Sequence, residues 1–224
     1  MTCKGEPIII WQEAIQPRQE HRKQEEQSNM KLQARKNAKF ERYVFGILLA
    51  VEVVMSFTTL GYIHIPPIST TTAFIPIVVV ACLFESWEST VAGLIFGLGS
   101  MLKASALYVM LDDKLFSPFR SGFPLQSLLL SVGTRVLFGL LIGWLYRFAK
   151  TGRLRWPWES LLAMAAPGIH AALVYGALGL MFSSKGADYR AAFQLHANVV
   201  FLPLLCLVCV VLCDVIYNSR DMTG

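Results

Sequence analysis

The sequence predicts an all-α integral membrane protein with six transmembrane helices and a polar N-terminal cytoplasmic extension. Of its 224 residues, 54% are hydrophobic and 16% are charged, and the mean hydropathy is +0.50. A soluble domain usually carries about a quarter of charged residues. Most of the charge lies in residues 1–42 and in short loops. The rest of the chain forms apolar runs near the roughly 20 residues that a helix needs to cross a bilayer.

Three regions follow from this distribution. Residues 1–42 form a charged cytoplasmic tail, residues 43–217 a six-helix membrane domain, and residues 218–224 a short cytoplasmic tail. From Gln12 onward the first tail mixes Lys and Arg with Glu and Gln, which predicts a solvated segment, either disordered or a loose helix on the membrane surface. A basic flank beside the first span favours the cytoplasmic side.

Six apolar runs are expected to cross the membrane, so that both termini lie on the same side. They cover residues 43–60, 72–84, 89–108, 125–148, 159–182 and 196–217. Lys and Arg are more frequent in the tail, in residues 147–155 and at Arg220 than in the loops of the opposite side. Those loops are 60–71, 109–124 and 183–195. Because basic loops stay in the cytoplasm, we expect a multi-pass protein of the cell membrane with both termini inside.

The loop between the first two runs differs from a plain connector. Pro66 and Pro67 restrict its backbone. Its polar side chains are His64, Ser69, Thr70 and Thr71. A polar segment of limited freedom in this place is typical of a lid over a solute pocket, and we expect these residues to contact a solute.

A charge at membrane depth is costly and indicates a functional site. The candidates are Glu52, Lys103, Arg135 and His170. Lys103 lies about a turn from the end of its run and is expected to extend its ammonium toward the interface. A guanidinium at the depth of Arg135 can hold a carboxylate through two parallel hydrogen bonds. The alternative is a purely structural pair of Arg135 with Glu52.

Further polar residues accompany Arg135. Ser127 and Ser131 precede it at spacings of four, which predicts one polar stripe on a helix that lines a water-filled cavity. His170 is either a packed, satisfied group or a donor to a solute oxygen. Asn198, at the mouth of the last run, belongs to the pocket if the pocket opens outward and to the membrane interface otherwise.

Small residues recur at helical spacing in two runs. They are Gly93, Gly97 and Ser100 in residues 89–108, and Gly46 and Ala50 in the first run. Such stripes let two backbones approach closely in lipid, where van der Waals packing drives association. They predict either packing inside the chain or contact with another subunit.

Other functional classes lack support in the sequence. Cys206, Cys209 and Cys213 share a helix face among apolar neighbours, which favours packing residues over metal ligands. No phosphate-binding loop, paired-carboxylate motif or aromatic-interleaved basic patch is present. We therefore expect neither an enzyme nor a nucleic-acid-binding protein, and no metal or cofactor.

Four segments follow one another along the chain: Ile68 to Val78, Gly93 to Ser100, Phe116 to Phe119 and Thr134 to Gly139. In this order they resemble the substrate-binding (S) components of energy-coupling factor (ECF) transporters. The resemblance covers about residues 43–217. It implies high-affinity capture of a vitamin or related micronutrient from outside the cell, as the specificity subunit of an ATP-driven importer. It also implies two kinds of partner, a transmembrane coupling subunit and two cytoplasmic ATPases.

The resemblance further implies that the first loop and the outer parts of the later helices form the pocket, while the early helices meet the coupling subunit. Three departures concern that family pattern. The alanine-spaced coupling face is reduced here to Gly46 and Ala50, His170 with Ala171 replaces a frequent Asn-Thr pair, and the charged N-terminal tail is longer than usual. Arg135 favours an anionic solute, such as pantothenate. The competing interpretation is a non-transport membrane scaffold, such as a cell-shape factor, which needs neither a lid nor a polar stripe.

Overall fold

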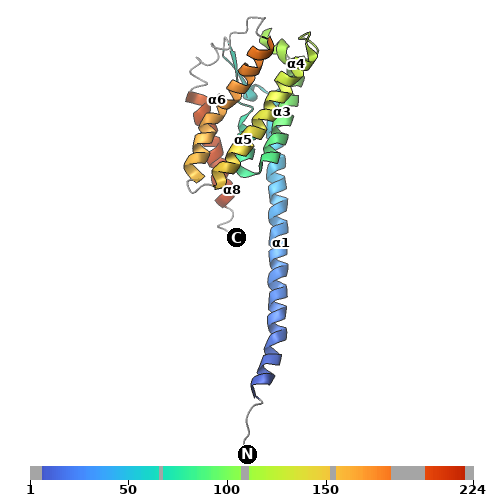
Figure 1. Cartoon of the computed structure of the whole chain (residues 1–224), viewed down its shortest axis with the longest axis vertical. Coiled ribbons are helices and arrows are strands. Elements are labelled where there is room, and N and C mark those ends of the chain that lie inside the picture. Colours follow the sequence, from blue (N-terminus) through green and yellow to red (C-terminus); the bar gives the residue numbers. More distant parts are fainter. Residues whose placement is uncertain (1–6, 66–67, 107–110, 152–154, 183–199, 220–224) are drawn as a thin grey trace, which may run out of the picture. The chain divides into compact units, whose positions relative to one another are not determined.

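The computed structural model describes residues 7–65, 68–106, 111–151, 155–182 and 200–219 (Figure 1). The chain divides into two compact units, residues 1–46 and 47–224, and each is described by itself. The described residues are mainly helical, with one two-stranded hairpin. The predicted all-α class is therefore correct for most of the described chain, and the hairpin is an addition to it.

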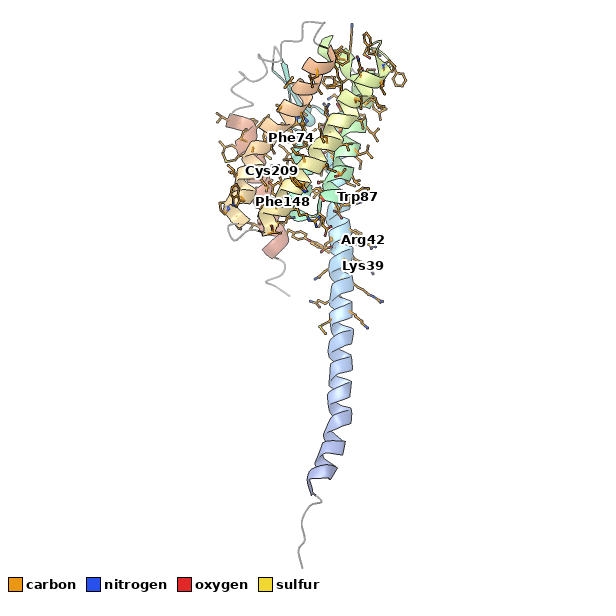
Figure 2. The ribbon with its side chains drawn as sticks, in the orientation of Figure 1. Lys39, Arg42, Phe74, Trp87, Phe148 and Cys209 are labelled. Carbon is orange, nitrogen blue, oxygen red and sulfur yellow. The ribbon has the colours of Figure 1, made fainter. Side chains whose placement is uncertain are left out.

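The first unit consists of the N-terminal part of helix α1, which extends over Pro7–Phe57. The charged tail is thus helical from Pro7, and no break separates it from the first apolar run. Glu, Gln, Lys and Arg lose little side-chain freedom in a helix, so the composition of the tail is compatible with this state. Lys39 and Arg42, labelled in Figure 2, are exposed on α1.

The predicted lid loop contains the hairpin. A short 3-10 turn, η1 (Thr59–Gly61), leads into strands β1 (Tyr62–Ile65) and β2 (Ile68–Thr71), which pair antiparallel. β-Branched residues are frequent in both strands, and such residues suit a pleated backbone. At the base of the hairpin the Thr72 hydroxyl donates to the carbonyl of Leu60, and the Thr72 amide donates to the carbonyl of Gly61 at 3.0 Å. The base of the hairpin is therefore fixed to η1.

The second unit continues with a series of helices around one buried helix. Their bounds are α2 Ile75–Leu83, α3 Ser86–Ala106, η2 Leu111–Phe116, α4 Pro124–Leu128, the π-helical turn η3 Leu129–Gly133, α5 Thr134–Thr151, α6 Arg155–Phe182 and α8 Leu202–Ser219. Helix α2 contacts α3, α5, α6 and α8, and every residue from Ile75 to Cys82 is buried. A helix that is apolar on all sides belongs inside a bundle.

Within the described residues, three helical stretches are long and apolar enough to cross a membrane: Ser86–Ala106, Pro124–Thr151 and Trp156–Phe182. They correspond to the third, fourth and fifth predicted spans. The other predicted spans fall on the end of α1, on α2 and on α8. The nine residues of α2 rise about 13 Å, less than half of a hydrocarbon core. The structure is thus compatible with a membrane protein.

Helices α3 and α5 lie side by side (Figure 1) and approach at backbone distance. A Cβ atom built on Gly97 would lie 2.8 Å from the Cα atom of Val132, and one on Gly93 would collide with the carbonyl oxygen of Arg135. The same two helices are also joined by a hydrogen bond: the hydroxyl of Ser89 on α3 donates to the carbonyl of Gly139 on α5 at 2.8 Å. Of the two predicted uses of this stripe, packing inside the chain is the one that the structure contains.

The two groups of small residues therefore differ in their surroundings. Ser100, like Gly93 and Gly97, is buried in α3. In contrast, a Cβ atom on Gly46 would have nothing within 4 Å, and Ala50 is exposed. Of the two predicted stripes, the one at Gly46 and Ala50 is therefore the one that remains open in the described residues.

We expect Gly97→Ala to lower the free energy of unfolding by about 1 to 3 kcal/mol, because the added methyl group forces the backbone of Val132 away. The matched control is Gly176→Ala on α6, where the new Cβ atom meets nothing within 4 Å. There the higher helix propensity of alanine should leave stability unchanged or raise it by up to about 1 kcal/mol. Denaturant unfolding of the detergent-solubilised protein measures both. An equal change in the free energy of unfolding for Gly97→Ala and Gly176→Ala would contradict the close backbone contact at Gly97.

Candidate functional site

The predicted polar stripe is buried in the segment from α4 to α5. Ser127 and Ser131 are fully buried and Arg135 is 4% exposed. The Ser131 hydroxyl donates to the carbonyl of Ser127 at 2.7 Å, and the Ser127 hydroxyl donates to the hydroxyl of Ser121 at 2.6 Å. The predicted spacing assumed a regular α-helix, whereas the π-helical turn η3 lies between Ser127 and Arg135. Both serine hydroxyls thus have hydrogen-bond partners nearby in the sequence.

The guanidinium of Arg135 contacts both polar and aromatic groups. Its Nη1 donates to the carbonyl of Leu130 at 2.7 Å and to the hydroxyl of Thr134 at 3.1 Å. Its central carbon lies 5.5 Å from the ring centroid of Phe96 and 5.0 Å from that of Phe116. A cation within about 6 Å of a ring face is attracted by the ring, more strongly where water is excluded.

The structural alternative for Arg135 was a pair with Glu52. The carboxylate of Glu52 is fully buried in α1. Its Oε1 accepts a long hydrogen bond of 3.5 Å from the Ser56 hydroxyl, and its Oε2 has no hydrogen-bond partner among the described residues. Neither oxygen of Glu52 therefore accepts a hydrogen bond from Arg135 in the described residues.

His170 on α6 is packed among aromatic rings. It stacks on Phe74, labelled in Figure 2, with ring centroids 5.2 Å apart, and lies 5.1 Å from Phe138 and 5.9 Å from Phe96. Its buried Nε2 atom has no hydrogen-bond partner among the described residues. An unsatisfied buried polar atom costs about 1 to 3 kcal/mol. His170 is therefore packed, as one interpretation predicted, but its Nε2 atom is not satisfied.

The ring of Phe96 brings Arg135 and His170 together, because both lie within 6 Å of its centroid. We call this group the aromatic cluster: Phe74, Phe96, Phe116 and Phe138 with Arg135 and His170. The four phenylalanines were missed by the sequence analysis. One signal was available, since Phe138 follows Arg135 at a spacing of three and so shares its helix face. The others come from different elements.

The remaining predicted site residues are only partly placed. In the hairpin, His64 is the register partner of Ser69, Thr70 that of Ile63, and Thr71 that of Tyr62. Asn198 lies outside the described residues. Lys103, near the end of α3, is half-buried.

No family model matches the chain, and no curated protein matches it.

The packing of His170 predicts that two substitutions change the free energy of unfolding in opposite directions. His170→Phe keeps an aromatic ring and removes the unsatisfied Nε2 atom, so the free energy of unfolding should stay the same or rise, by about 1 to 3 kcal/mol at most. His170→Ala should lower it by about 2 kcal/mol or more, because a cavity forms among the rings. Denaturant unfolding compares the two. A loss in His170→Phe as large as in His170→Ala would mean that Nε2 is stabilised in the folded protein.

Proposed function

We propose that this chain is the substrate-binding component of an ECF-type importer and captures a vitamin or related micronutrient from outside the cell. The observation that carries the proposal is the burial of Arg135 and His170 around one phenylalanine ring inside an apolar helical bundle. Burying such groups is costly unless they are compensated. A solute that binds there recovers part of that cost, whereas a membrane scaffold gains nothing from it.

The proposed solute is anionic, for which pantothenate is an example. A guanidinium offers five N–H donors in a planar fork that suits a carboxylate, and the rings beside it exclude water and strengthen the contact. His170 adds a buried nitrogen without a hydrogen-bond partner. In the proposed pocket Arg135 forms the floor, and His170 and Asn198 lie on the walls.

The hairpin is the proposed lid. Its base is held by the contacts of Thr72 with Leu60 and Gly61, so that closure requires little further ordering of the chain. In this proposal His64, Ser69, Thr70 and Thr71 meet the solute from the outer side. Closure would remove water from the Arg135 contact.

Uptake also needs partners, since the sequence holds no phosphate-binding loop of its own. We propose a transmembrane coupling subunit and two cytoplasmic ATPases. Gly46 and Ala50 are the candidate coupling face, because their surroundings in the described chain are open while those of Gly93 and Gly97 are occupied by the chain itself.

The direct experiment is mass spectrometry of small molecules that remain on the purified protein, followed by titration of the identified solute. We expect Arg135→Ala to weaken an anionic solute by orders of magnitude, because loss of one partner from a buried charge contact costs several kcal/mol. The matched control, Glu52→Gln, removes a different buried charge and should leave affinity nearly unchanged. Unchanged affinity in folded Arg135→Ala would contradict the anion site. Absence of the ATPases on co-purification would favour the scaffold.

The proposed orientation places both termini in the cytoplasm and the hairpin outside. In a background without native cysteines, a membrane-impermeant thiol reagent added outside intact cells should label Ser69→Cys and not Arg153→Cys. This expectation follows from the excess of Lys and Arg on the proposed inner side. Labelling of Arg153→Cys and not of Ser69→Cys would show the opposite orientation and contradict the proposal.

A further inference from the structure

A second buried polar group lies on α2, separate from the aromatic cluster. It joins Cys82 on α2, Glu159 on α6 and Asp214 on α8. One ligand atom of each side chain lies within 4.8 Å of the others, and the three residues are 2%, 5% and 7% exposed. Cys82 follows Phe74 by eight residues, or about 12 Å along a helix. The two groups therefore occupy different levels of the bundle.

The second group is buried and rich in acidic side chains. Two carboxylates and a thiol, when ionised, carry three negative charges, and buried charges in proteins are paired or coordinate metals. Among the described residues, the ammonium of Lys150 lies close by, because it donates to the carbonyls of Phe84 at 2.7 Å and Ala81 at 3.3 Å, which flank Cys82 along the chain. A divalent cation at the group would add two further positive charges to that of Lys150.

We propose that Cys82, Glu159 and Asp214 bind a divalent transition-metal ion of the Zn²⁺ type. A thiolate ligand disfavours Mg²⁺ and Ca²⁺, which prefer oxygen ligands alone, whereas Zn²⁺ accepts both sulfur and carboxylate oxygen. Three protein ligands leave a fourth position of a tetrahedral ion for water. Ligands at 2.0 to 2.3 Å from such an ion lie about 3.5 Å apart, so the ligand atoms need to approach one another by about 1.3 Å at most.

The site would connect three elements that are far apart in the sequence. Helix α6 begins, and α8 ends, at the same end of the bundle (Figure 1). The beginning of α6 is held there independently of a metal, because the Tyr146 hydroxyl donates to the carbonyl of Glu159 at 3.1 Å. A bound ion would fix α2, α6 and α8 to one another at this end. The proposal does not depend on the proposed transport function.

The test uses the full-length protein, purified in detergent and stripped with a chelator. Co²⁺ is the probe, since a cobalt–thiolate bond gives a charge-transfer band in the near ultraviolet. We expect about one Co²⁺ per chain, this band, and displacement of Co²⁺ by Zn²⁺. A wild-type protein that binds no Co²⁺, or binds it without the band, overturns the proposal whatever the variants do, and leaves Lys150 as the compensating charge.

The variants locate the site. Cys82→Ser should abolish the band and weaken Co²⁺ binding at least tenfold, and Asp214→Asn should weaken binding comparably. The matched control is Cys209→Ser, at a half-buried thiol of α8 labelled in Figure 2, and it should bind Co²⁺ as the wild type does. Binding is compared among variants that elute as a single species in size-exclusion chromatography. If Cys82→Ser does not fold, Cys82→Ala is used in its place. A band that persists without Cys82 overturns the assignment.

Discussion

The arrangement of the bundle depends on the backbone contact between α3 and α5. Glycines on both helices remove the side chains that would hold them apart, and the Ser89 hydroxyl bonds directly to the carbonyl of Gly139. Gly93 lies against the carbonyl of Arg135, and Phe96 follows Gly93 at a spacing of three. The same contact that joins the helices thus brings the guanidinium of Arg135 to the ring of Phe96. A larger residue at Gly93 would separate the two.

Features that depend on the spacing of residues within one helix can be predicted from the sequence. Features that depend on which other segment packs against that helix cannot. The glycine stripe of α3 predicts a close approach, because it is visible in a single helix. It does not identify α5 as the partner, because another subunit would select the same spacing. Likewise, nothing in residues 125–148 indicates the π-helical turn at Leu129–Gly133, and the lid segment contained a hairpin that polarity alone did not reveal.

The buried ionisable residues can likewise be found in the sequence, but their partners cannot. Glu52 and Arg135 are recognisable in the sequence because they interrupt apolar runs. Whether they pair depends on how each helix is rotated, and the structure gives Glu52 the hydroxyl of Ser56 and Arg135 the carbonyl of Leu130. Cys82 illustrates the limit further. Its sequence neighbours are apolar, so its proximity to two carboxylates follows only from the packing of three helices.

Both polar groups lie along α2, and the shortness of this helix provides a physical reason. A helix that crosses a bilayer leaves its unsatisfied terminal N–H and C=O groups near water, whereas α2 has only nine residues and is surrounded by other helices. Its ends therefore need partners inside the bundle. At the first end the amide of Ile75 donates to the carbonyl of Thr72 at 3.0 Å, and at the other Lys150 donates to the carbonyls of Ala81 and Phe84. An ammonium drawn into the bundle to satisfy carbonyl groups also makes nearby carboxylates less costly to bury. A short central helix thus favours polar residues at the level of its ends, where His170 and Asp214 are found.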